Sequence, residues 1–419
     1  MHKDLDLSYP NLESLTIPTY PVKNTNNPNT SWDIDDLMAM IRAHPLISSL
    51  SLILGMDCDS ASIWKLISEL GNLRNLCIRG LPVLQDGLEY FSRTCARLES
   101  LSLAGYHIVN KGDFDSITFP RIQSLQLSTC EKSSHIDDLE LIRRCTGLRK
   151  LVWCNLSRPH DPTSTAEFHR MATARTWPKL ESLTIDNHSL PDDKLAEILR
   201  VMRKITTLRF GEGFGQLSYV ELRPHFATVK ELGLVSCELV TSAMIQEVLS
   251  SCPLLEKFEG PRIHAKDITK GRPWVCTELK QLTVCIDIDS AEADQAQPLV
   301  FEQMSQLTQL ETLNLNASIR IRDDEEDHQY ETDPVLGVLL LPFQESIDLR
   351  LEKGLEKLCS LELLRELKFK GTTQKLSTIE VDWMAEHWPY LESISGSLNC
   401  DRAINEELAE RFLQYGVMI

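Results

Sequence analysis

Long apolar runs and a leader-like start are both missing from this chain of 419 residues. No stretch approaches the roughly 18 consecutive apolar residues that a membrane-spanning helix requires. The opening Met-His-Lys-Asp-Leu-Asp-Leu also lacks the apolar core of a signal peptide. We therefore expect no membrane partner and an intracellular location, either cytoplasmic or nuclear.

Positive charge is in deficit. Lysine and arginine number 43 against 61 aspartate and glutamate residues, so the formal net charge is −18. The acidic residues are spread widely along the chain and do not form one tail. This balance argues against nucleic acid or an anionic membrane as the main partner.

The twelve cysteines include no C-x-x-C pair, which argues against a zinc site or a redox motif. Cys95, Cys145, Cys252 and Cys276 recur at one position of a repeat described below. Free cysteine behaves as a small buried hydrophobe, so a shared core position explains this recurrence. A reducing compartment is consistent with it, and we expect no metal site.

Catalytic signatures are also missing. No H-E-x-x-H, G-x-S-x-G, P-loop or dinucleotide fingerprint stands in a suitable context. Gly211-Glu-Gly213-Phe-Gly215 is glycine-rich, but it lacks the lysine and the following helix of a phosphate cradle, so we interpret it as a loop. We predict no catalytic residues, no cofactor and no enzymatic activity.

What the chain does contain is a repeat. Fourteen stretches follow the pattern L-x-x-L-x-L with apolar substitutions, and most start 24 to 26 residues after the previous one. The fourteen starting positions are Leu12, Ile47, Leu73, Leu98, Ile122, Leu148, Leu180, Ile205, Val229, Leu255, Leu279, Leu310, Leu364 and Leu391. A period of 20–29 residues with this pattern is the leucine-rich-repeat signature.

Alternation along a strand turns the fourth and sixth motif residues inward and the third and fifth outward. The segments between motifs show helical spacing, as at Ile63, Trp64 and Ile67, and Ser164-Thr-Ala-Glu167 reads as a helix capping box. We predict an α/β leucine-rich-repeat solenoid of about 14 repeats spanning residues 1–419 as one domain. Its parallel strands would line the concave face of a horseshoe, and its helices would cover the convex face.

Two places depart from the period. Between Leu315 and Leu364, residues 316–335 are predicted to be an acidic loop insertion that holds Asp323-Asp-Glu-Glu-Asp327. This run is a solvated loop or a docking tag for a basic partner. The rest of the interval holds either a longer helix near residues 351–361, which we favour, or one degenerate repeat. Residues 400–419 are predicted to form a C-terminal capping helix.

The outward motif positions are mostly serine and threonine in the first repeats and carry more charge in the later ones. Exposed strand residues are ordinarily of this kind. The functional interpretation is a shallow protein-binding surface on the concave face, with an aromatic side chain near its rim. Its candidate residues are Lys150, Arg209, Glu231, Lys257, Glu259 and Tyr106.

Three motifs with a preceding cysteine resemble the cysteine-containing, ribonuclease-inhibitor-like repeats of F-box proteins, in a fungal-looking form. They are Cys95-Ala-Arg-Leu98-Glu-Ser-Leu101, Cys145-Thr-Gly-Leu148-Arg-Lys-Leu151 and Cys252-Pro-Leu-Leu255-Glu-Lys-Phe258. The resemblance implies a scaffold that recognises a substrate protein for a ubiquitin ligase. We also expect the protein to be a monomer.

In that family a separate F-box binds the Skp adaptor of the ligase. The chain has no Leu-Pro-x-Glu opening and only eleven residues before Leu12. A Skp-type adaptor is therefore expected as a partner only if an F-box is supplied elsewhere. The alternative is a free-standing leucine-rich-repeat adaptor or regulator, directed at a GTPase or the cytoskeleton and unrelated to ubiquitination.

Overall fold

The computed structural model of the chain describes most residues after the first motif begins. The described ranges are 13–18, 34–54, 59–108, 117–129, 135–155, 162–186, 190–289, 291–316, 332–333, 338–339, 347–372 and 374–419. They divide into two compact units, residues 1–190 with 197–204 and residues 191–196 with 205–419, and the division falls within α6 (Asp192–Val201). In a repeat array each turn contacts mainly its neighbours, so a division of this kind can arise within one domain. That residues 1–419 form a single domain stays a prediction.

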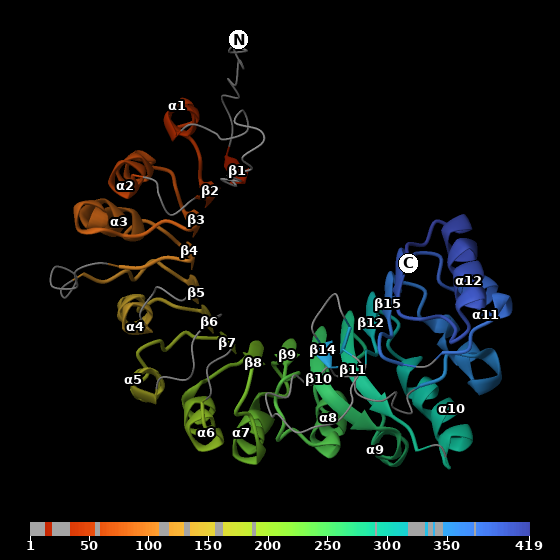
Figure 1. Cartoon of the computed structure of the whole chain (residues 1–419). Helices are drawn as coiled ribbons and strands as arrows, with labels where there is room; N and C mark the ends of the chain where they lie inside the picture. The colour runs from red at the N-terminus through yellow and green to blue at the C-terminus, as the bar shows by residue number, and fades with distance from the viewer. Residues whose placement is uncertain are drawn as a thin grey trace, which may run out of the picture. The chain divides into compact units, whose positions relative to one another are not determined.

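The first unit alternates parallel strands with helices. Its seven strands are β1 (Ser14–Pro18), β2 (Ser49–Ile53), β3 (Asn75–Arg79), β4 (Ser100–Ala104), β5 (Ser124–Thr129), β6 (Lys150–Asn155) and β7 (Ser182–Asp186). Its helices are α1 (Ile34–Ala43), α2 (Ser60–Glu69), η1 (Gln85–Gly87), α3 (Leu88–Cys95), α4 (His135–Arg144) and α5 (Pro162–Thr173). Strand order follows chain order, and the helices lie on one side of the strands (Figure 1).

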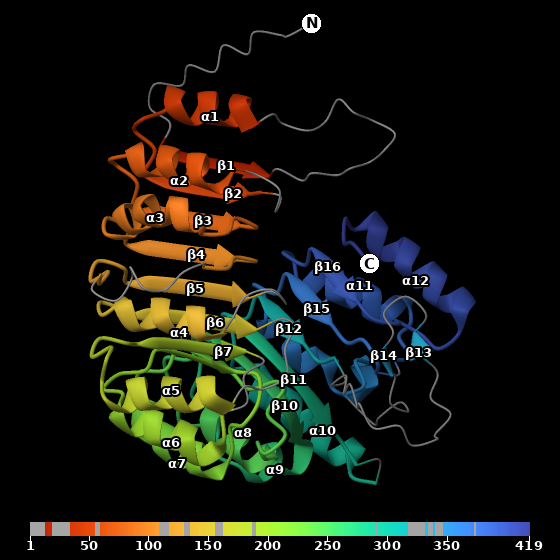
Figure 2. The same cartoon turned by 60° about the vertical axis from the view of Figure 1, so that its left-hand side comes forward.

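The second unit repeats this plan. Its seven ladder strands are β8 (Thr207–Phe210), β9 (Glu231–Gly233), β10 (Lys257–His264), β11 (Gln281–Asp287), β12 (Thr312–Asn314), β15 (Glu366–Lys368) and β16 (Ser393–Ser395). Its helices are α7 (Gln216–Leu222), η3 (Arg223–His225), α8 (Ser242–Leu249), α9 (Ala265–Lys270), α10 (Ala293–Met304), η4 (Leu351–Lys353), η5 (Leu355–Ser360), α11 (Thr378–His387) and α12 (Arg402–Gln414). Figure 2 shows the strands from another side.

Each motif supplies one strand, and the strands pair in motif register. Leu76 of β3 pairs with Leu101 of β4, which pairs with Leu125 of β5, and all three side chains are buried. Burying one such side chain is worth about 1.5–3 kcal/mol relative to leaving it exposed. The predicted α/β leucine-rich-repeat solenoid is therefore confirmed, with motif positions four and six forming its core.

A second buried layer lies three residues before most of the described motifs. Cys95, Cys145, Cys252 and Cys276 are completely buried there, and the ten cysteines described by the structure are all free thiols. Burial raises the pKa of Cys252 and of Cys276 to about 12, so neither thiol ionises at neutral pH. These cysteines serve as small apolar core residues.

Two helix predictions need correction. α5 begins at Pro162, so Ser164 lies inside the helix and is buried, and Glu167 bonds to Arg170 instead of closing a capping box. The longer helix near residues 351–361 is instead a pair of 3-10 helices, η4 and η5. β12 pairs directly with β15, so no further ladder strand intervenes among the described residues.

Beyond β12, the predicted insertion at 316–335 lies mainly outside the described residues. Its described parts are Asn316 and β13 (Thr332–Asp333), which pairs with β14 (Val338–Leu339) as a short antiparallel hairpin.

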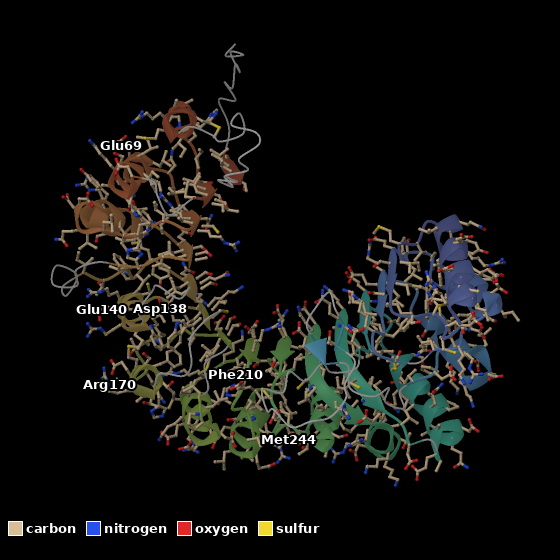
Figure 3. The ribbon with its side chains drawn as sticks, in the orientation of Figure 1. Glu69, Asp138, Glu140, Arg170, Phe210 and Met244 are labelled. Atoms are coloured by element: carbon tan, nitrogen blue, oxygen red, sulfur yellow. The ribbon has the colours of Figure 1, made fainter. Side chains whose placement is uncertain are left out.

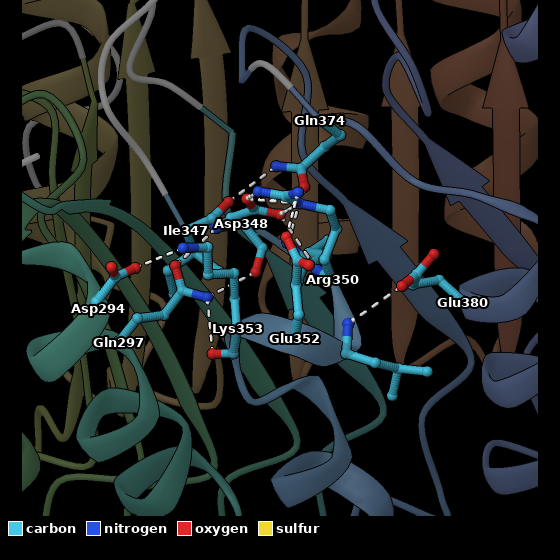
Figure 4. A network of polar contacts seen from close by, with 11 residues as sticks. Asp294, Gln297, Ile347, Asp348, Arg350, Glu352, Lys353, Gln374 and Glu380 are labelled. Atoms are coloured by element: carbon cyan, nitrogen blue, oxygen red, sulfur yellow. Dashed lines mark hydrogen bonds and ion pairs between the residues drawn. The ribbon is translucent and has the colours of Figure 1, made fainter.

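Two buried glutamines bracket the chain after this interval (Figure 4). Gln297 of α10 donates to the carbonyls of Asp348 and Lys353 and accepts from the Asp348 amide. On the other side, Gln374 donates to the Ile347 carbonyl and accepts from the Leu349 amide. These side chains satisfy main-chain groups that no neighbouring ladder strand reaches.

The last residues of the chain meet the last strand. Ile394 of β16 donates to the Met418 carbonyl, and Met418 donates to the Glu392 carbonyl. α12 packs against α11 through Arg411, whose guanidinium bonds Asp382 at 2.5 and 2.6 Å. The predicted helix within 400–419 thus corresponds to α12, and its capping role stays a prediction.

Candidate recognition surface

We call the side of each ladder that carries the third and fifth motif residues the strand face. In the first unit this face is polar and carries little charge. The row Ser49, Asn75, Ser100, Ser124, Lys150 is in register across β2 to β6, and Ser51, Cys77, Ser102, Gln126, Val152 form the parallel row. Lys150 is exposed in this setting.

In the second unit, three charged side chains join into what we call the strand-face network. Arg209 of β8 lies 2.8 Å from Glu259 of β10, and Lys257 of the same strand lies 3.0 Å from Glu259. The Glu259 side chain is only 14% exposed, whereas Arg209 and Lys257 are 45% and 37% exposed. A largely buried carboxylate thus holds two cations that remain open to solvent.

The network depends on a glycine. Gly233 of β9 pairs in register with Arg209 on one side and Glu259 on the other. A Cβ atom at Gly233 would lie 2.8 Å from Cγ of Arg209, closer than such atoms approach in proteins. Glycine therefore lets the Arg209 side chain cross β9 and reach Glu259.

A second ion-pair group lies further along β10 and β11. Asp287 at the end of β11 lies 3.2 Å from Arg262 and 3.6 Å from His264, both on β10. Burial raises the pKa of Asp287 above its ordinary value, although Arg262 and His264 oppose this shift. Sequence reasoning missed these residues because the register of β10 shifts between Glu259 and Arg262, which breaks the spacing of the motif.

The predicted site residues fall in different places. Glu231 is exposed on β9, directly beside Lys257 in register. Arg209, Lys257 and Glu259 meet in the strand-face network, while Lys150 belongs to the first unit. The protein-binding role of all five remains a prediction.

The interpretation of Tyr106 as an exposed rim aromatic is wrong. Its side chain is 1% exposed, and its hydroxyl donates to Asp138 Oδ1 at 2.5 Å. Trp153 donates through Nε1 to the other Asp138 oxygen at 2.9 Å, and Asp138 is itself completely buried on α4 (Figure 3). Tyr106 is therefore a core residue that serves a buried carboxylate.

Among the described residues, no three histidine, cysteine or acidic side chains gather in a way that would hold a metal ion. In the same part of the chain, no helix is both long and apolar enough to span a bilayer.

Comparisons with known proteins give structural likeness alone. No family model and no curated protein sequence matches the chain. Solved structures that it resembles include an internalin from Listeria monocytogenes, at 15% identity and a TM-score of 0.36, over 69% of this chain and 73% of that one. Another is TLR13 in complex with single-stranded RNA, at 13% identity and a TM-score of 0.42, over 85% of this chain and half of that one. Likenesses this distant do not extend to function.

Proposed function

We propose that the protein is a non-enzymatic recognition scaffold whose protein partner docks on the strand face of the second unit. The strand-face network is the observation that carries this proposal. Arg209 and Lys257 stay exposed while they hold the largely buried Glu259, so the network presents fixed positive charge to solvent on the strand face.

The network suits recognition because it fixes charged side chains before a partner arrives. Immobilising a long side chain at an interface costs about 0.5–1.5 kcal/mol. Glu259 already holds Arg209 and Lys257 in one geometry, so part of that cost is met in the free protein. Arginine is also enriched among residues that dominate interface energetics.

The finer proposal follows the resemblance to F-box repeats: the scaffold is the substrate-binding region of an F-box-type ubiquitin ligase subunit. The repeat class and the buried cysteine layer support it. The second candidate is a free-standing adaptor or regulator unrelated to ubiquitination. Sequencing the gene upstream of Met1 separates them, since an F-box-like segment favours the first and an in-frame stop codon favours the second.

Proximity labelling with the intact chain tests the proposed surface. We expect Arg209→Glu with Lys257→Glu to remove the specific partners, because the two reversals repel Glu259 and invert the local charge. Lys150→Glu forms a separate arm that tests the first unit.

The matched control reverses two cations that are also paired and exposed, Lys357→Glu with Arg402→Glu. It should leave labelling unchanged. Equal loss in both double variants would show that net charge, not the strand face, governs capture. A further variant, Gly233→Ala, retains every charge but displaces the Arg209 side chain. It should weaken labelling of the partners without unfolding the chain.

A further inference from the structure

Helices α8 and α9 of the second unit contact each other (Figures 1 and 2). Two cavities adjoin beside them. Each has a volume of about 460 Å³. One is bounded by the β9–α8 loop, the start of α8 and the end of β10; the other is bounded by the later turns of α8 and the end of α9. They share Ala243 and Asp267, so they form one depression, which we call the α8–α9 groove.

The groove is rich in cations, in contrast to a chain of net charge −18. Its cationic lining residues are Arg262, Lys266, Lys270 and Arg272, its acidic ones are Glu238, Glu247 and Asp267, and the His264 imidazole also lines it. Glu247 pairs with Arg223 outside the groove at 2.7 Å. Arg262 and His264 pair with Asp287, as described above.

Three of the cations have no such pairing. Lys266, Lys270 and Arg272 are exposed, and none lies within ion-pair distance of a carboxylate in the described part of the chain, although the charge of Arg272 acts on Glu247. Lys266 and Lys270 are four residues apart and share one face of α9. Glu238 and Asp267 stand against these three cations, so the groove keeps an excess of positive charge.

The groove also lies against a strand edge. β9 ends at Gly233, whereas its neighbour β10 continues to His264. The His264 amide points away from β11 and donates to Ser242 Oγ at 2.8 Å. Main-chain groups two residues apart along a strand point to the same side, so Arg262 directs its main chain toward the groove. An extended peptide adds to an edge of this kind through main-chain hydrogen bonds.

We propose that the α8–α9 groove binds an extended acidic segment of a partner protein. The unpaired cations match carboxylates, and the edge of β10 matches an extended main chain. The groove shares no lining residue with the strand-face network of Arg209, Lys257 and Glu259, so either proposal can fail while the other stands.

The test measures binding to the full chain by fluorescence anisotropy. The probe is a short fluorescein-labelled peptide of alternating Glu and Thr, compared with its Gln-for-Glu counterpart. We expect the acidic peptide alone to bind. Lys266→Glu with Lys270→Glu should weaken its binding at least about tenfold, which corresponds to about 1.4 kcal/mol. Lys370→Glu with Lys375→Glu changes net charge equally outside the groove and should leave the affinity within about twofold.

A variant without charge change keeps the test independent of electrostatics and of folding defects. Ala243 is exposed at the junction of the two cavities, so Ala243→Trp should fill the groove, abolish peptide binding and leave thermal melting unchanged. No binding by the wild-type chain would overturn the proposal, as would equal weakening in both lysine pairs or full binding by Ala243→Trp. Displacement of the peptide by equimolar inorganic phosphate would identify a simple anion site and also overturn it.

Discussion

Single residues in this protein are placed by partners from other turns of the array. Tyr106 shows this most clearly, because its hydroxyl turns inward to Asp138, 32 positions later in the chain. An aromatic residue just after a strand has the sequence character of a rim residue. The inward orientation of Tyr106 is explained by the buried carboxylate of Asp138, because burying a carboxylate is costly unless hydrogen-bond donors reach it.

Tyr106→Phe therefore should reduce the free energy of unfolding by about 1–3 kcal/mol, because Asp138 loses one of its buried donors. Urea denaturation measures this loss. Tyr90→Phe on α3 is the matched control, since the Tyr90 hydroxyl bonds to no other group within the described residues. Similar effects in both variants would refute the role assigned to the Tyr106 hydroxyl.

Asp192 gives a prediction about pH. Burial raises its pKa, but hydrogen bonds from Ser218, Leu217 and Gly215 outweigh burial and hold the pKa below its ordinary value. The depressed pKa stabilises the fold above the unfolded-state value of about 3.9, and this contribution is lost as pH falls through the lower folded-state pKa.

Asp192 accepts from the Leu217 and Ser218 amides in the first turn of α7, as an N-cap side chain does. Asp192→Asn should therefore lower the free energy of unfolding by about 1 kcal/mol at neutral pH, the usual contribution of a helix N-cap. The difference from wild type should shrink in urea titrations carried out at progressively lower pH below 3.9. A difference independent of pH would show that the Asp192 charge is irrelevant. Glycine at position 215 leaves room for the Asp192 carboxylate, because a Cβ atom there would lie 2.7 Å from Asp192 Oδ2.

At the scale of elements, strands were predictable and their irregularities were not. The inward leucines of β3 and β4 follow from a period visible within a few residues. The register shift in β10, which places Arg262 and His264 beside Asp287, depends on pairing with β11. The bracket of Gln297 and Gln374 depends on contacts more than 20 residues away. Local patterns carry no signal for such contacts.

Gln297→Ala should cost about 2–4 kcal/mol, because each buried main-chain group left unpaired costs about 1–3 kcal/mol. Hydrogen exchange at the Asp348 amide, which now donates to Gln297, should accelerate with it. Gln295→Ala on the same helix changes an exposed side chain and should be neutral. Unchanged exchange at Asp348 would contradict the bracketing role.

At the scale of the whole molecule, stability is shared between neighbouring turns, since no single turn buries its leucines alone. Leu208 of β8 is completely buried, while Thr207 beside it points outward. Leu208→Asp should destabilise by at least about 4 kcal/mol, because it buries a charge. Hydrogen-exchange protection should fall in β9 and β10 as well as in β8. Thr207→Asp should leave that protection in place, and loss confined to β8 would contradict a shared core.

The claim that the strand face of the second unit receives a partner is tested most directly by photo-crosslinking in cells. A benzophenone amino acid would replace Thr283, which lies beside Glu259 in register, or Leu299, which is 47% exposed on α10. We predict discrete crosslinked species from position 283 that disappear with Arg209→Glu and Lys257→Glu. Crosslinks from position 299 alone, or from 283 in spite of both reversals, would contradict the proposed recognition surface.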